Sequence, residues 1–253
     1  MNKLKPLPEE WSGLLNNEQK EAIENINGPL LIIAGAGSGK TRVLTYRYAH
    51  LIKTYGINFE NVLAITFTNK AANEMKDRIS DLLNLELSPK WISTFHSLCV
   101  KMLRIHGHLI GFNNNFTIYD QSDSTKLVRN CMRDSDIDTK QYSPKRIQAH
   151  ISSLKNQRIL PGEAVEFAQS FFDVKVAEIY SSYQKKLMLA NSMDFDDLLI
   201  KAVELLETSD KSLNYWSSKF QYIMIDEYQD CLLYTSDAAD DMQCVDLGGR
   251  RII

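Results

Sequence analysis

Eight residues near the amino terminus, Ala34–Thr41, read AGAGSGKT and have the composition of a phosphate-binding loop. Its glycines let backbone N–H groups wrap phosphate oxygens, and a following helix points its positive end at them. Lys40 can reach the β and γ oxygens, and the Thr41 hydroxyl can ligate Mg²⁺. The loop therefore predicts nucleotide binding by Ala34, Gly35, Ala36, Gly37, Ser38, Gly39, Lys40 and Thr41, with Ala34 standing where the first glycine often stands.

A pair of carboxylates, Asp226 and Glu227, follows the apolar run Tyr222–Ile225. One carboxylate can hold Mg²⁺ through water, and the next can orient or deprotonate an attacking water. The alternative is a solvated acidic strand end without a chemical role. Because a phosphate loop lies upstream, the sequence favours the catalytic interpretation.

Gln19 lies one short predicted helix ahead of the loop. An amide offers one donor and one acceptor, which is what reading an adenine edge requires. Without further information, a surface glutamine is the better interpretation of this residue.

Two further predicted strand ends carry polar and aromatic side chains, TFTN at 66–69 followed by Lys70, and STFH at 93–96. Ligands bind at the carboxyl edge of open parallel sheets. Phe67 and Phe95 can stack on bases, unless both belong to the core. The candidates for contacts to the phosphates of a single strand are Thr66, Asn69, Thr94 and His96.

The elements that must position these residues alternate along the chain. Short apolar runs predict strands, and apolar residues at intervals of three or four predict helices. The predicted strands are 28–35, 61–69, 90–95 and 220–227, and the predicted helices are 41–53, 70–83, 96 to about 107 or 111, and 194–207. The run 28–35 ends in glycine and is typical of a strand buried on both faces. Strand signals vanish over 117–193, which indicates a helical insertion in an α/β protein.

Composition excludes several classes of protein. A hydrophobic fraction of 44% and a charged fraction of 24% are typical of globular proteins. No run approaches the roughly 18 apolar residues of a membrane span, and the start lacks the apolar core of a signal peptide. The four cysteines form no C-x-x-C pair, and the histidines show no metal-ligand spacing. We expect a cytoplasmic protein without a membrane partner or structural metal.

Six segments together resemble a known family. LNNEQ, AGAGSGKTR, AITFTNKAANEM, ISTFHSLCVKMLR, MDFDDLL and IDEYQD are similar, in order and spacing, to the amino-terminal motifs of superfamily 1 DNA helicases of the UvrD/PcrA/Rep type. The resemblance runs from about Leu14 to Asp230. It implies a RecA-like parallel sheet core of the P-loop class, with an inserted all-helical subdomain. The implied domains are 1–116 and 194–230 for the ATP-binding core, and 117–193 for the insertion.

The resemblance also implies an activity. Such proteins use ATP and Mg²⁺ to move 3′-to-5′ along single-stranded DNA and to separate duplexes in repair or replication. The implied partners are single-stranded DNA, duplex junctions and proteins of repair or replication. Two alternatives stay open: the helicase subunit of a helicase-nuclease recombination complex, and a non-catalytic ATP-binding module.

Roles for individual residues follow from the matching motifs. Gln19 would contact adenine, and Arg42 would complete the ATP-binding set. Phe67 and His96 would line the DNA track. The implied catalytic residues are Lys40, Asp226 as the Mg²⁺ support, Glu227 as the catalytic base and Gln229 as the sensor of the γ-phosphate.

The segment after Asp230 departs from the family pattern. Codons for Cys231–Asp240 and Val245–Ile253 match two sequencing adapters, and Asp241–Cys244 would be the index between them. We therefore predict that 231–253 is a non-native tail. We also expect a truncated chain that lacks the second motor core, whose arginines are worth roughly 10³ to 10⁵ in rate. Such a fragment would bind ATP, hydrolyse it slowly and unwind nothing.

Overall fold

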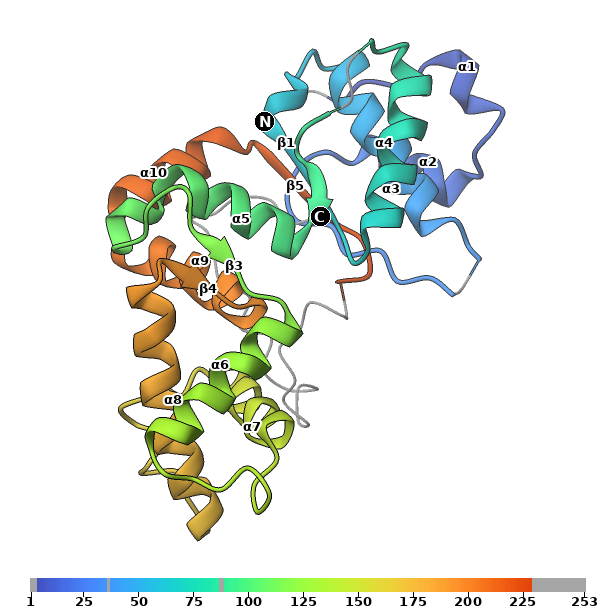
Figure 1. Cartoon of the computed structure of the whole chain (residues 1–253). Helices are drawn as coiled ribbons and strands as arrows, with labels where there is room; N and C mark the ends of the chain where they lie inside the picture. Colours follow the sequence, from blue (N-terminus) through green and yellow to red (C-terminus); the bar gives the residue numbers. More distant parts are fainter. Residues whose placement is uncertain (1–3, 36, 87–88, 229–253) are drawn as a thin grey trace. The chain divides into compact units, whose positions relative to one another are not determined.

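A computed structural model describes residues 4–35, 37–86 and 89–228 of the chain (Figure 1). The chain divides into two compact units. The described residues of Met1–Leu98 and Asn214–Ile253 form the first unit, and Cys99–Leu213 form the second. The predicted insertion, 117–193, falls within the second unit, and its boundaries stay a prediction. Gln229, the predicted tail and Ala36 lie outside the described residues. Among the helices that the structure describes, none has the length and apolar character needed to span a membrane.

The first unit contains a three-stranded parallel sheet in the order β2-β1-β5. Its strands are β1 (Val62–Thr66), β2 (Ile92–Thr94) and β5 (Tyr222–Ile225). All five residues of β1 are buried, as expected for a central parallel strand. The pairing sets Thr66 opposite Thr94 and Ile65 opposite Ile225. The carboxyl ends of the three strands therefore meet at one edge of the sheet.

Helices of the first unit pack on this sheet and on one another. They are α1 (Glu9–Ser12), α2 (Asn17–Glu24), α3 (Lys40–Lys53), α4 (Asn69–Leu83) and the 3₁₀ turn η1 (Phe59–Asn61), with the start of α5 (Phe95–His106) and the end of α10 (Asp210–Lys219). The buried face of α4 comes from Ala72, Met75 and Ile79, which recur at helical spacing. Thr68 begins this helix, because its hydroxyl accepts the N–H of Ala71 at 3.1 Å.

The core beneath the sheet confirms most of the predicted pattern. Leu44, Tyr48 and Leu51 of α3 pack with Ala64 of β1 and Met224 of β5. The predicted strands at 61–69, 90–95 and 220–227 correspond to β1, β2 and β5, and the helices predicted at 41–53 and 70–83 correspond to α3 and α4.

The strand predicted at 28–35 is wrong. No residue of this segment pairs with a described strand, and its apolar side chains are not enclosed. Leu31 is 59% exposed and Ile33 is 88% exposed, whereas Leu30 and Ile32 pack partly against the core. A buried parallel strand needs a hydrogen-bonded neighbour. Because the described sheet gives this run none, its apolar composition does not make it a strand.

The second unit is mainly helical. Its elements are the remainder of α5, η2 (Gly107–Ile110), β3 (Thr117–Ile118), α6 (Gln121–Asp134), α7 (Pro144–Asn156), α8 (Phe171–Leu189), β4 (Ser192–Met193), α9 (Phe195–Thr208) and the start of α10. Apolar residues of α6, α7 and α8 form one core around Val128, Ile151 and Tyr183. The parallel pair β3–β4 was not predicted, because strands of two residues carry no readable alternation.

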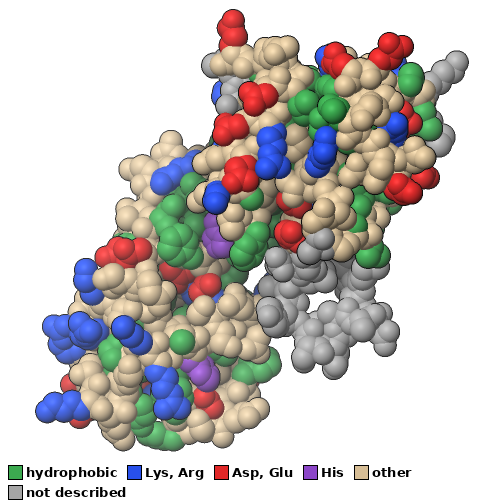
Figure 2. Space-filling model, turned by 90° about the vertical axis from the view of Figure 1, so that its right-hand side faces the viewer, with side chains coloured by type: hydrophobic (Ala, Val, Ile, Leu, Met, Phe, Trp, Pro, Cys, Tyr) green, Lys and Arg blue, Asp and Glu red, His purple; other side chains and the backbone are tan. Residues whose placement is uncertain are grey.

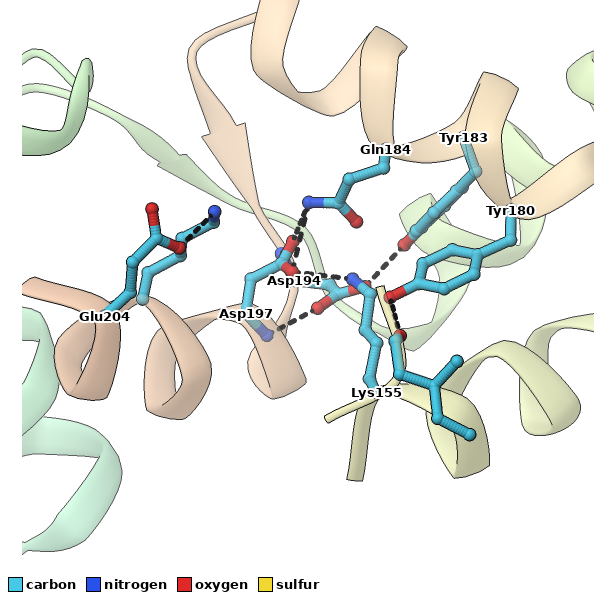
Figure 3. A network of polar contacts seen from close by, with 9 residues as sticks. Lys155, Tyr180, Tyr183, Gln184, Asp194, Asp197 and Glu204 are labelled. Atoms are coloured by element: carbon cyan, nitrogen blue, oxygen red, sulfur yellow. Dashed lines mark hydrogen bonds and ion pairs between the residues drawn. The ribbon is translucent and has the colours of Figure 1, made fainter. Parts of the chain in front are cut away.

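A buried polar network ties α7, α8 and α9 together (Figure 3). The Lys155 ammonium, on a residue only 1% exposed, donates to Asp194 Oδ2 at 2.7 Å and to Asp197 Oδ1 at 2.8 Å. The Tyr183 hydroxyl donates to Asp194 Oδ2 at 2.8 Å, and Gln184 Nε2 donates to Asp197 Oδ1 at 3.1 Å. Burial raises the pKa of Asp197, while the Lys155 ammonium acts in the opposite direction. One cation therefore pairs with two carboxylates that also cap the start of α9.

We predict that Lys155→Met destabilises the chain. The substitution leaves two buried carboxylates without their cation, and breaking a buried pair from one side costs about 3–5 kcal/mol. Urea unfolding followed by circular dichroism measures the loss. Lys185→Met, at an exposed position of α8, is the matched control and should change stability by no more than about 0.5 kcal/mol. Equal stability of the two variants would contradict the assignment of this network as a stabilising element.

Candidate nucleotide-binding site

The predicted phosphate loop ends at the first turn of α3. Gly37 and Gly39 have positive φ values of 77° and 90°, which side chains with a Cβ rarely adopt. Gly39 is the N-cap of α3, and within the described part of the chain no side chain caps this helix end. The first turn of α3 also contains no acidic residue. Its N–H groups are therefore suited to an anion such as phosphate.

The Lys40 ammonium lies against the loop itself. Its Nζ donates to the carbonyl oxygens of Ala34 at 2.9 Å and Gly35 at 3.4 Å. The Ser38 hydroxyl donates to the same Gly35 carbonyl at 2.7 Å. These bonds hold the cation at the loop that the sequence predicts for phosphates. The neighbouring Arg42 is exposed, and its guanidinium lies 5.6 Å from the ring centre of Tyr46.

Gln19 is joined to this loop. Its Nε2 donates to the Ser38 carbonyl at 3.1 Å, and its Oε1 accepts the N–H of Asn16 at 3.1 Å. Asn16 in turn accepts the Gln19 N–H at 2.8 Å, which completes a capping box at the start of α2. Gln19 is half-buried and supports the loop, and adenine contact stays a prediction. The Asn-x-x-Gln spacing is the sequence signal for this cap.

Two oxygen ligands from distant parts of the chain meet beside the loop. The Thr41 hydroxyl donates to Asp226 Oδ2 at 3.0 Å, although 185 positions separate the two residues. Burial is the main factor that raises the pKa of Asp226, and the charge of Glu227 adds to it, whereas the Thr41 hydrogen bond lowers it. A hydroxyl and a carboxylate are hard oxygen ligands of the type that Mg²⁺ takes. A cation here would also favour the ionised form that burial disfavours, so the residues fit a Mg²⁺ site.

Glu227 has an unusual backbone conformation. Its φ is 53°, and its N–H donates to Asp226 Oδ1 at 3.2 Å. A residue with a Cβ in this region is strained by roughly 1–3 kcal/mol, and such strain is found at functional sites. The side chain is half-buried. No sequence pattern had indicated this conformation.

The threonines at the ends of β1 and β2 are buried and bonded within the protein. Thr66 Oγ1 donates to the Thr68 carbonyl at 3.0 Å, and Thr94 Oγ1 donates to Ser97 Oγ at 3.0 Å. Both residues lie at the same edge of the sheet as Asp226, because the parallel register aligns the strand ends. Their burial favours a role in positioning the loops, and direct contact with a nucleic acid stays a prediction.

The other predicted nucleic-acid residues are at the surface. Phe67 is 65% exposed, so it does not belong to the core, while Phe95 is half-buried. Asn69 and Lys70 begin α4, and His96 lies in the first turn of α5; all three are exposed. The predicted residues therefore divide into a buried pair that supports the edge and an exposed group that can touch a ligand.

Comparison with known proteins decides the family. The profile of the UvrD/REP helicase N-terminal domain matches residues 15–235. The chain belongs to the UvrD/REP helicase family. The match extends five residues past Asp230 into the segment predicted to be adapter-derived, and that prediction stays untested. The α/β fold described above, a parallel sheet with its phosphate loop and a helical unit, is the fold expected of a UvrD/REP amino-terminal domain.

Individual UvrD/REP relatives agree with the profile. The chain is 45% identical over 216 residues to the ATP-dependent DNA helicase PcrA of Staphylococcus aureus (strain Mu50) and to that of Staphylococcus epidermidis (strain ATCC 12228). The alignments cover 85% of this chain and 30% of each relative. The chain therefore spans about a third of the length of the curated relatives that it matches.

We predict that Gly39→Ala lowers the stability of the chain by straining the loop before α3. A Cβ at this position would lie 2.9 Å from Gln19 Nε2, on a backbone with a φ of 90°. Strain of about 1–2 kcal/mol and displacement of the Gln19 amide should lower the free energy of unfolding. Gly13→Ala is the control, because Gly13 has a φ of −75° and no atom within 4 Å of its Cβ position. If Gly39→Ala unfolds at the same urea concentration as Gly13→Ala, the loop does not require this conformation.

We also predict that Asp226→Asn raises the melting temperature of the nucleotide-free chain at neutral pH. A raised pKa means that the folded carboxyl holds its proton more tightly than the unfolded one, so stability falls as pH rises above 3.8 through the folded pKa. An amide carries no such penalty and can still accept the Thr41 hydrogen bond. The gain should shrink toward pH 4, and Asp77→Asn, on the exposed face of α4, should show none. A melting temperature below that of the parent chain would overturn this account.

Proposed function

We propose that this chain binds ATP with Mg²⁺ and forms the amino-terminal ATP-binding part of an ATP-dependent DNA helicase like PcrA. The observation that carries the proposal is the hydrogen bond between Thr41 of the loop and Asp226 of the sheet edge. It joins the phosphate loop to the acidic strand end, which a nucleoside triphosphatase requires in one place.

Each residue of the site would have a separate task. The N–H groups at the start of α3 and the Lys40 ammonium would hold phosphate oxygens. Thr41 and Asp226 would hold Mg²⁺, which neutralises phosphate charge when it is bound. Glu227, next to Asp226, would accept the proton of the attacking water. Gln19 would offer the adenine edge one donor and one acceptor. Arg42, which lies near the loop, would complete the ATP-binding residues.

A nucleic acid would contact the exposed residues at the carboxyl edge of the sheet. Phe67 offers an open ring on which a base can stack, an interaction worth about 1–3 kcal/mol per base. Lys70, Asn69 and His96 would bind phosphates, while Thr66 and Thr94 hold the strand ends in place. We propose single-stranded DNA and duplex junctions as substrates, 3′-to-5′ movement, and cytoplasmic work in repair or replication with other proteins.

The rate of the chain by itself should be low. The relatives are named ATP-dependent DNA helicases, and this chain spans about a third of their length. Arginines that would stabilise the transition state are expected on a second motor core. We therefore propose that residues 1–230 bind ATP but hydrolyse it slowly and do not separate DNA strands. The segment 231–253 is proposed to add nothing to either step.

We predict that Lys40→Ala and Glu227→Gln separate binding from hydrolysis. Loss of the Lys40 ammonium should weaken binding of a fluorescent ATP analogue by tenfold or more, since it removes a charge-assisted contact to phosphate. Glu227→Gln should leave this affinity unchanged and lower the hydrolysis rate by about 10² to 10⁴.

The controls distinguish this prediction from misfolding. Lys185→Ala, on the surface of α8, should bind the analogue like the parent chain. Hydrolysis at the parental rate in Glu227→Gln would contradict the assignment of Glu227 as the catalytic base.

A further inference from the structure

A polar groove lies on the second unit, and none of its lining residues is assigned a role above. It has a volume of about 520 Å³. Its lining comes from the end of α5, from η2 and from the turn that follows, and consists of Arg104, Ile105, His108, Asn113, Asn114 and Asn115. The side chains offer a guanidinium, an imidazole and three amides, but no carboxylate. The lining is therefore rich in hydrogen-bond donors.

Arg104 is held in one position. Its guanidinium carbon lies 3.9 Å from the ring centre of Phe116, and its Nη1 donates to the Asn114 carbonyl at 2.6 Å. A guanidinium has five N–H donors in a rigid plane, so this bond leaves others for a ligand. Fixing the plane before binding reduces the entropy that a ligand contact costs.

The turn Asn113–Asn115 is held by two hydrogen bonds to the side chain of Asn191. Asn191 Oδ1 accepts the N–H of Asn113 at 3.0 Å, and Asn191 Nδ2 donates to Asn115 Oδ1 at 3.3 Å. Because the Asn115 oxygen accepts this bond, its amide NH₂ remains a donor. A turn held at both ends can present its amides at fixed positions.

The segment that forms the groove carries basic side chains and no acidic one. The sequence contains no Asp or Glu between Glu86 and Asp120, although Lys101, Arg104 and His108 fall in this stretch. Burial lowers the pKa of the adjacent His106, and the positive charges of His108 and Lys211 lower it further. On the face drawn in Figure 2, basic and acidic side chains are interspersed. A groove that is lined by hydrogen-bond donors and lies on a basic segment favours an anion.

We infer that this groove binds a phosphate group of a nucleic-acid strand. Phosphate accepts several hydrogen bonds at once and matches the plane of a guanidinium. Asparagine amides and a half-exposed isoleucine next to it suit the sugar and base of the same nucleotide. The choice of a strand rather than a free phosphate rests on the proposed function, and the groove would be a second contact for DNA on this chain.

The test uses the full chain and a fluorescent dT oligonucleotide. Fluorescence anisotropy measures the affinity at several salt concentrations for the parent chain, Arg104→Gln, His108→Gln and the control Lys185→Gln. We expect Arg104→Gln to weaken binding roughly five- to tenfold and to reduce the salt slope by about 0.7, the value for one phosphate on a single strand. His108→Gln should weaken binding to a smaller extent, and Lys185→Gln should not change it.

Folding and the source of the phosphate are checked separately. His108→Gln changes an exposed side chain, so it keeps the test valid if Arg104→Gln does not fold. Nuclear magnetic resonance of the His108 ring is followed during addition of the oligonucleotide and, in a second titration, of pyrophosphate. A shift with both supports the inference. A shift with pyrophosphate alone would show a free-phosphate site and overturn the assignment to a strand.

Two results would overturn the inference as a whole: no shift of the His108 signals with either ligand, or equal oligonucleotide affinity in all four proteins. ATP binding in the absence of DNA is measured on the same samples. In the proposed function, ATP binding depends on Lys40 and Asp226 and not on the groove. Loss of ATP binding would therefore count against the proposed ATP site, whereas the oligonucleotide affinity and the His108 signals test the groove.

Discussion

The parallel pairing of β1 with β2 and β5 is the constraint on which the candidate site depends. In a parallel sheet every strand ends at the same edge, so the residues after each strand are brought together whatever their separation in sequence. Thr66, Thr94 and Asp226 meet in this way. The N–H of Asp226 donates to the Ile65 carbonyl at 2.8 Å, which extends the ladder by one residue and fixes the start of the acidic pair.

The buried carboxylates of the two units have different partners. In the second unit, Asp194 and Asp197 have a permanent cation in Lys155 and several hydrogen bonds, as a structural network requires. Asp226 in the first unit is buried and accepts hydrogen bonds from the neutral Thr41 hydroxyl and from the Glu227 N–H, and the charge of Glu227 lies close by. A bound cation would offset the cost of burying the Asp226 charge, whereas Lys155 already supplies a cation to Asp194 and Asp197. The contrast separates an acid that supports the fold from one that suits a metal ion.

The phosphate loop is also coupled to its neighbours through backbone conformation. Gly39 has a positive φ where α3 begins. Because Gly39 has no Cβ, the Gln19 amide can lie against it and donate to the Ser38 carbonyl. Glu227 takes a similar conformation on the other side of the site. A ligand that moves either residue would therefore also move the turn that holds it.

The sequence alone determined the features that depend on neighbours along the chain. The glycines and lysine of the loop, the apolar spacing of α3 and α4, and the family motifs are local patterns, and local patterns can be read directly. Only the tertiary structure decided the rest. Residues 28–35 have the composition of a buried strand, but a strand also needs a partner, and the described sheet offers none. The sequence motifs assigned Thr41 and Asp226 to one Mg²⁺, but the hydrogen bond between them depends on register. The three-helix network of Lys155 and the Arg104 groove depend on packing, for which a single sequence carries no signal.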